Sequence, residues 1–177
     1  MRFHKIGIKI IAMFLVITVL FSGPMATMAA EADELEGMLV GKIKVEPCYT
    51  DEELRLMSAI IFCEAGAESY TGKVAVGIVV MNRVRSDLFP NTVKKVIYER
   101  GQFTPARSGA LARALKLYDD GKFTQKNHLD SIKAAKKVLQ GCTTLTIKGK
   151  ETDMKSYLFF SVYLRNRRLK IGNHMFR

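Results

Sequence analysis

Residues 60–84 constrain the fold of this chain more than any other stretch of its sequence. The stretch holds two apolar segments joined by a short polar turn; Glu64 ends the first segment and Glu68 lies in the turn. Apolar segments of this kind have to be buried against another element of the fold. A carboxylate at the end of a buried face loses hydration, which raises its pKa. The stretch therefore predicts two packed elements with a candidate proton donor where they meet.

The first of these elements is predicted to be a helix that begins after Thr50. Thr50 and Glu53 have the spacing of a capping box, in which each side chain binds the other residue's backbone amide. Apolar residues then recur at helical spacing, at Leu54, Met57, Ile60 and Ile61. Glu64 follows the last two at four and three residues, so it continues the same stripe. We expect Glu64 at the inner, C-terminal end of a buried helix.

The second apolar segment has an ambiguous pattern. Gly66 is expected to end or loosen the first helix, and a polar turn then runs to Gly72. The valines of residues 74–80 favour a buried strand, whereas the unbroken apolar character through Val84 favours a helix buried on all sides. Periodicity alone leaves both open.

The first 30 residues have the pattern of a secretory signal peptide. Three basic residues precede an apolar run at residues 10–21, and small residues at 26–30 offer cleavage after Ala29 or Ala30. The run is short for a membrane-spanning helix of about 20 residues. We expect an exported protein, with an uncleaved N-terminal anchor as the alternative. Residues 31–50 are then predicted to be a linker and residues 51–177 a single folded domain.

The net charge of the chain limits the classes of binding partner that we expect. Without residues 1–30, 25 basic side chains face 17 acidic ones, a net charge of +8. A positive surface attracts polyanions. Export and the lack of a recognisable nucleic-acid motif argue against nucleic acid, which leaves anionic lipid and anionic cell-wall polymers. The alternative is that the charge only keeps the protein soluble. We expect a monomer with no membrane contact beyond the signal segment.

The three cysteines do not define a site. Cys48, Cys63 and Cys142 match no zinc spacing and allow at most one internal disulfide, so we expect no metal and no cofactor. Cys63 could act as a nucleophile with His128 or His174 as its base. A lone cysteine on an apolar face is more often a small core residue.

The remaining chain predicts further helices followed by a small sheet. Asn91 or Thr92 can cap a short helix that ends at Tyr98. Residues 111–118 and 129–139 are amphipathic, and Gly141 follows the second of these helices at a position typical of a helix end. Residues 143–147, 156–164 and 169–176 are rich in β-branched or aromatic side chains, which predicts an antiparallel sheet.

Four ordered motifs in residues 51–177 resemble the cell-wall hydrolases of the spore cortex-lytic, SleB type. The first is the run F-C-E-A-G-A-E-S-Y-T-G-K-V-A-V-G-I-V-V-M-N-R-V at residues 62–84. The others are F-P-N-T-V with V-I-Y at residues 89–98, G-Q-F-T-P at 101–105 and I-G-N-H-M-F at 171–176. Two stretches depart from the family pattern: Gly66-Ala67 stands where Arg-Gly is usual, and residues 106–127 differ from the consensus.

The resemblance implies a fold and an activity. It implies a small lysozyme-like α+β domain, mainly helical with a small antiparallel sheet, in which residues 74–84 are a helix. It also implies cleavage of the glycan strand of peptidoglycan, in spore cortex or vegetative wall, by a lytic transglycosylase or muramidase-like enzyme. By the same resemblance, Glu64 corresponds to the catalytic glutamate. A non-catalytic wall-binding protein that keeps the fold is the alternative function.

The chemistry of glycoside cleavage assigns roles to the remaining candidates. Hydrolysis usually needs two carboxylates, and Glu64 and Glu68 have the i,i+4 spacing of neighbours on a helix. A lytic transglycosylase needs one, because the sugar's own C6 hydroxyl attacks and one glutamate acts first as acid and then as base. We therefore assign Glu64 as the acid/base and Glu68 as a helper or substrate-binding residue. The other predicted supporting or substrate-binding residues are Gln102, Phe103, Asn173 and His174.

Overall fold

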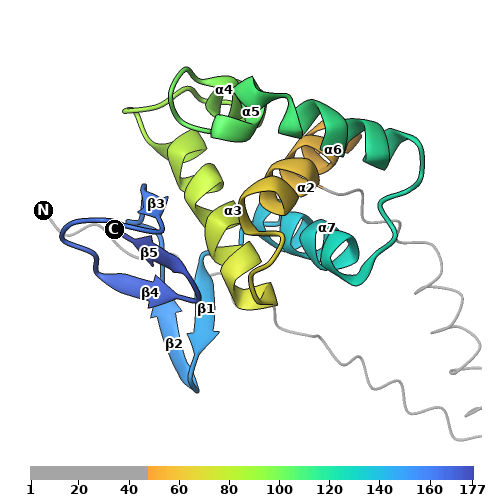
Figure 1. The fold of residues 1–177 in the computed structure, drawn as a ribbon. Coiled ribbons are helices and arrows are strands. Elements are labelled where there is room, and N and C mark those ends of the chain that lie inside the picture. Colours follow the sequence, from red (N-terminus) through yellow and green to blue (C-terminus); the bar gives the residue numbers. More distant parts are fainter. Residues whose placement is uncertain (1–47) are drawn as a thin grey trace, which may run out of the picture. The chain divides into compact units, whose positions relative to one another are not determined.

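The structure, a computed structural model, describes residues 48–177, and its elements are labelled from α2 onward in Figure 1. The predicted signal peptide and most of the predicted linker lie outside the described residues. The boundary between linker and domain stays a prediction.

Two consecutive helices form the centre of the fold. Helix α2 (Asp51–Ala65) begins with the predicted capping box, in which Glu53 N donates to Thr50 Oγ1 and Thr50 N donates to the Glu53 carboxylate. Helix α3 (Tyr70–Arg85) is capped by Ser69, whose hydroxyl accepts from Gly72 N at 3.2 Å. The valine-rich segment is thus helical, as the resemblance implied. Its apolar side chains from Val74 to Val80 are fully buried around the helix, and Met81 and Val84 are partly buried, which agrees with an element that is apolar on all sides.

Four shorter helices complete the helical part: α4 (Val93–Tyr98), α5 (Thr104–Ser108), α6 (Ala110–Asp119) and α7 (Lys126–Leu139). Thr92 caps α4 and Gly141 follows α7 with a φ of 95°, as the sequence predicted, whereas α5 was not predicted. Helix α2 packs against α3, α6 and α7, and α3 packs against α7 (Figure 1). No helix within residues 48–177 combines the length and the apolar character that crossing a membrane requires.

A glycine allows helices α2, α3 and α7 to approach one another closely. Gly77 lies in the middle of α3, and a Cβ atom there would lie 2.9 Å from Ile61 on α2 and 3.0 Å from Val138 on α7. Only a residue without a side chain fits this contact without a shift of its neighbours. This packing fixes the position of α2, and therefore of Glu64 near its end.

The strands form two small antiparallel sheets. Strands β1 (Thr144–Ile147) and β2 (Lys150–Asp153) make a hairpin. The second sheet has the order β3-β5-β4, with β3 at Phe160–Ser161, β4 at Leu169–Ile171 and β5 at His174–Phe176. The α+β class is as predicted. The strand ranges differ: β2 was missed, residues 169–176 are two strands, and most of residues 156–164 are not a strand.

The polar end of α3 binds the segment that follows β2. Asn82 Nδ2 donates to the carbonyls of Met154 (2.7 Å) and Tyr157 (2.9 Å), and Arg83 Nε donates to that of Leu158 (2.8 Å). These bonds supply buried donors to carbonyls of a segment that has little regular structure of its own. Asn82 and Arg83 therefore fasten the sheet region to the helical core.

Candidate active site

Glu64 lies in a pocket between α2 and α6. Its side chain is half-buried in the last turn of α2, and the pocket has a volume of about 640 Å³. One wall comes from the end of α2 and the following turn, and the other comes from α6 and the start of α7. The lining residues are Phe62, Cys63, Glu64, Gly66, Ala67, Ala110, Arg113, Ala114, Leu117 and Asn127. Glu64 is the one carboxylate among these described residues.

The surroundings of Glu64 favour its protonated form. Burial raises the pKa of the Glu64 carboxyl, and the positive charge of Arg83 opposes that rise. A carboxyl whose pKa is raised in a partly apolar pocket retains its proton nearer to neutral pH and can act as a general acid. The nearby guanidinium would stabilise the carboxylate once that proton has been given away.

Arg83 is held rigidly by aromatic rings. Its side chain is 4% exposed, and its guanidinium carbon lies 5.0 Å from the centre of the Phe89 ring and 5.2 Å from that of Phe103. Cation–π contacts of a desolvated guanidinium contribute about 2 kcal/mol or more. The predicted binding residue Phe103 is 2% exposed and contacts Arg83 rather than the Glu64 pocket.

Lys73 binds the turn that follows Glu64 at the end of α2. It is 1% exposed, and its Nζ donates to the carbonyls of Ala65 (2.6 Å), Gly66 (2.7 Å) and Glu68 (2.9 Å). The last carbonyls of a helix lack partners within the helix, and a cation near them also interacts favourably with the helix dipole. The lysine thus serves as the C-terminal cap of α2.

Glu68 binds a turn that is distant in sequence. Its carboxylate accepts from the backbone N of Asn173 (3.3 Å) and from Asn173 Nδ2 (3.0 Å), in the two-residue turn between β4 and β5. Gly172 in that turn has a φ of 56°, and a Cβ atom there would overlap the Glu68 carboxylate. Glu68 and Asn173, both predicted to be functional, therefore meet each other.

His174 packs beneath the same turn. It is 7% exposed, and its ring lies 5.3 Å from that of Phe160, edge to face. Burial lowers the pKa of His174, while the charge of Glu68 opposes the decrease. The neutral imidazole is therefore a packing group between aromatic rings in this structure. Gln102 is half-buried in the connection between α4 and α5, and it does not line the Glu64 pocket.

The sequence-based reasoning missed Arg113 and Asn127. Arg113 lies on one stripe of α6 with Ala110, Ala114 and Leu117, at i, i+3, i+4 and i+7, and all four line the pocket. The argument that found Glu64, a charged residue on an apolar stripe, would have found Arg113 as well. It was overlooked because residues 106–127 resemble no family motif.

The cysteine-nucleophile alternative has little support from the structure. Burial and the nearby Glu64 charge raise the pKa of the Cys63 thiol to about 11, which disfavours the reactive thiolate. His128, one of its possible bases, accepts at Nδ1 from Gln125 N and stacks on Phe123. Within residues 48–177 no group of three or more His, Cys, Asp or Glu side chains could hold a metal ion.

Known proteins resemble this chain over most of the described residues. The family model described as Cell Wall Hydrolase matches residues 67–177. The spore cortex-lytic enzyme of Bacillus cereus is 41% identical over 63 residues, which is 36% of this chain and 24% of that enzyme. The enzyme of the same name from Oceanobacillus iheyensis is 39% identical over 69 residues, covering 39% of this chain and 25% of that enzyme. The chain spans about a quarter of the length of these relatives.

A solved structure gives a longer match. The catalytic domain of the germination-specific lytic transglycosylase SleB from Bacillus anthracis superposes with a TM-score of 0.50 at 25% sequence identity. The match covers 75% of this chain and 98% of that domain. It confirms the predicted fold class, a small lysozyme-like α+β domain.

The cap provided by Lys73 generates a prediction about stability. Lys73→Met keeps the apolar stem but leaves three carbonyls without their charged donor, so we expect the free energy of unfolding to fall by about 3 kcal/mol. Urea unfolding followed by circular dichroism measures the change. Lys126→Met is the control, because the exposed Lys126–Asp130 ion pair should contribute less than about 1 kcal/mol. Equal losses in the two variants would contradict the capping role.

The raised pKa of Glu64 predicts a pH dependence. The folded state holds this proton to higher pH than the unfolded state does, so the wild type loses stability as pH rises from the unfolded pKa through the folded one. Glu64→Gln removes that loss. Its unfolding free energy relative to wild type should therefore increase from pH 3.5 to pH 7.5 in urea titrations. A difference that decreases over this range would show that the pKa of Glu64 is lowered instead.

Proposed function

Because the chain belongs to the Cell Wall Hydrolase family, we propose that it cleaves the glycan strands of peptidoglycan as a lytic transglycosylase, with Glu64 as its single acid/base. The observation that carries the proposal is the half-buried Glu64 carboxyl, whose pKa is raised in a pocket that it shares with Arg113. The relatives named above are spore cortex-lytic enzymes, so spore cortex is the first substrate to test. Export through residues 1–30 would bring the domain to that substrate.

The proposed reaction needs no second carboxylate. Glu64 gives its proton to the glycosidic oxygen while the bond from that oxygen to C1 breaks. The oxygen of the C6 hydroxyl forms a bond to C1, and its proton passes to the Glu64 carboxylate. The acid is regenerated, no water is consumed, and the product ends in a 1,6-anhydro sugar.

The position of Glu68 supports this reaction over two-carboxylate hydrolysis. Both of its oxygens are engaged by the Asn173 turn, and Glu68 does not line the Glu64 pocket. We infer that Glu68 is a positioning residue, which ties the β4–β5 hairpin to the turn after α2. Asn173 and His174 then act through that hairpin rather than on the reacting bond.

The charge of Arg113 suggests which part of the substrate it meets. Arg113 makes no ion pair within the described residues and lines the pocket opposite Glu64. A guanidinium matches a carboxylate geometrically through paired hydrogen bonds. In the proposed complex Arg113 therefore binds an acidic substituent of the glycan strand and Asn127 binds a neutral polar group.

Glu64→Gln provides the direct test of the proposed reaction. Removing a general acid should lower the rate of muropeptide release from purified cortex or sacculi about 10²- to 10⁴-fold. Mass spectrometry of the wild-type products should find 1,6-anhydro ends rather than reducing ends. Cys63→Ala is the control in the same pocket and should retain activity. Two outcomes would point to the non-catalytic wall-binding alternative. One is release by Glu64→Gln at the wild-type rate, and the other is binding of the wild-type protein to sacculi without any release of muropeptides.

Glu68→Gln separates a positioning role from a catalytic one. Glutamine keeps one acceptor oxygen for Asn173, so we expect activity within about tenfold of wild type, whereas Glu68→Ala should lose stability by about 1–3 kcal/mol. Thermal unfolding and muropeptide release measure the two effects separately. Glu68→Gln would overturn the assignment if it folded like wild type and were as inactive as Glu64→Gln.

A further inference from the structure

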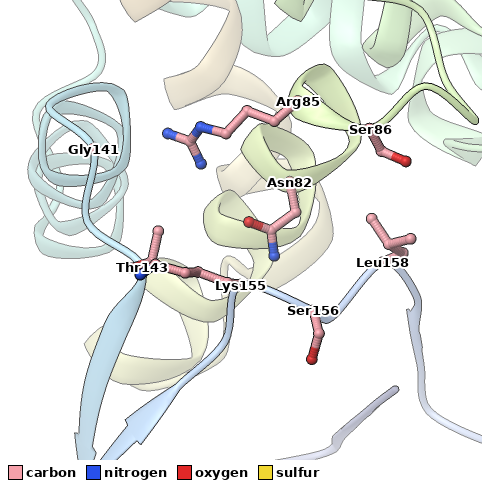
Figure 2. Close-up of a pocket in the computed structure, with 8 residues that line it drawn as sticks. All are labelled: Asn82, Arg85, Ser86, Gly141, Thr143, Lys155, Ser156 and Leu158. Atoms are coloured by element: carbon pink, nitrogen blue, oxygen red, sulfur yellow. The ribbon is translucent and has the colours of Figure 1, made fainter. Parts of the chain in front are cut away.

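A second pocket lies at the C-terminal end of α3. It has a volume of about 620 Å³ and is formed by the C-terminal end of α3, the connection from α7 to β1 and the segment after β2 (Figure 2). Its lining residues are Asn82, Arg85, Ser86, Gly141, Thr143, Lys155, Ser156 and Leu158. None of them lines the Glu64 pocket. The proposed reaction therefore does not use this pocket.

Two exposed cations reach into this pocket. Figure 2 shows the side chains of Arg85 and Lys155 extending toward the connection that carries Gly141 and Thr143. Neither cation makes an ion pair with an acidic side chain among residues 48–177. Exposed cations gathered without a carboxylate partner attract an anion from solution.

A third cation lies at the edge of the pocket. Arg168 donates from Nη1 to Ser156 Oγ (3.2 Å) and from Nη2 to the Ser156 carbonyl (2.9 Å), and its guanidinium lies 4.3 Å from the centre of the Tyr157 ring. These contacts hold the guanidinium beside the pocket without neutralising its charge. Ser156 Oγ accepts this bond, so its own proton is left to donate.

The charge around the pocket continues along the chain. Residues 154–177 contain six basic side chains and no acidic ones: Lys155, Arg165, Arg167, Arg168, Lys170 and Arg177. Several cations spread over one segment favour a ligand with repeated negative charges over a single small anion. Guanidinium groups also match phosphate oxygens through paired hydrogen bonds.

The neutral lining residues indicate what lies between the phosphates. Ser86, Thr143 and Ser156 offer hydroxyl groups, and the pocket has no aromatic residue. Proteins that bind single-stranded nucleic acids stack bases on aromatic side chains, so these residues suit a polymer of alcohols better than one of bases. We propose that this pocket binds a polyol phosphate polymer, as an accessory site independent of Glu64.

The experiment measures binding of the full-length protein to synthetic poly(glycerol phosphate) at 50 to 300 mM NaCl. Arg85→Gln/Lys155→Gln removes the two central cations and should weaken binding at least about tenfold and reduce the salt dependence. Lys95→Gln/Lys133→Gln is the matched control, because it removes the same charge from exposed helix positions outside the pockets described above. The control should bind within about threefold of wild type.

Further probes distinguish the source of the binding. Inorganic phosphate should compete only weakly with poly(glycerol phosphate), and polyglutamate should bind more weakly than that polymer. Any binding of single-stranded DNA should not depend on Arg85 and Lys155. The proposal would be overturned if the two double variants weakened binding of poly(glycerol phosphate) equally. It would also be overturned if polyglutamate or DNA bound as tightly as that polymer and depended equally on Arg85 and Lys155. Lys155→Gln alone, with thermal unfolding as a check on folding, keeps the test valid if the double variant is unstable. Cleavage of short soluble glycans should not change, so a failure of this site is distinguishable from a failure of the proposed reaction.

Discussion

The ammonium group of Lys73 holds together the turn between Glu64 and Glu68, the two candidate carboxylates of the site. The last carbonyls of a helix have no partner within the helix and need donors from elsewhere, and those of α2 find one on α3. Lys73 comes from the second turn of α3 and binds the carbonyls of Ala65, Gly66 and Glu68. Burial lowers the pKa of this lysine, with nearby acidic side chains opposing the decrease. The Lys73 side chain thereby fixes the turn that connects Glu64 to Glu68.

The fixed turn gives the two glutamates different environments. Glu64 precedes the turn and lies against α6, where burial raises its pKa and leaves it available for proton transfer. Glu68 follows the turn and is engaged by backbone and side-chain donors of Asn173. Glu68 is thereby committed to binding the β4–β5 turn, whereas burial favours the neutral, proton-donating form of Glu64. Two residues four positions apart are therefore suited to opposite tasks.

The sequence predicted the helix caps, which depend on neighbouring residues, and missed contacts between residues that are distant in sequence. The capping box of α2 and the Thr92 cap of α4 are local, and both were predicted correctly. The single strand expected at residues 169–176 was wrong because Gly172 and Asn173 make a turn, which Glu68 stabilises from 105 residues away. Lys73 was also overlooked, since a lysine is almost always exposed unless its ammonium group is paired. Its partners are carbonyls, which leave no trace in the sequence.

The pocket around Glu64 is built from parts of the chain that lie far apart in sequence. Glu64 comes from the last turn of α2, while Arg113 comes from α6 and Asn127 from the start of α7. Helices α6 and α7 supply a cation and a neutral polar group to this pocket but no acid. Helix α2 adds the carboxyl, and its packing around Gly77 and its cap at Lys73 determine where that carboxyl stands. Glu64 is the one carboxylate that lines this pocket among the described residues, and burial raises its pKa, which together are the physical reason for proposing it as the single acid/base.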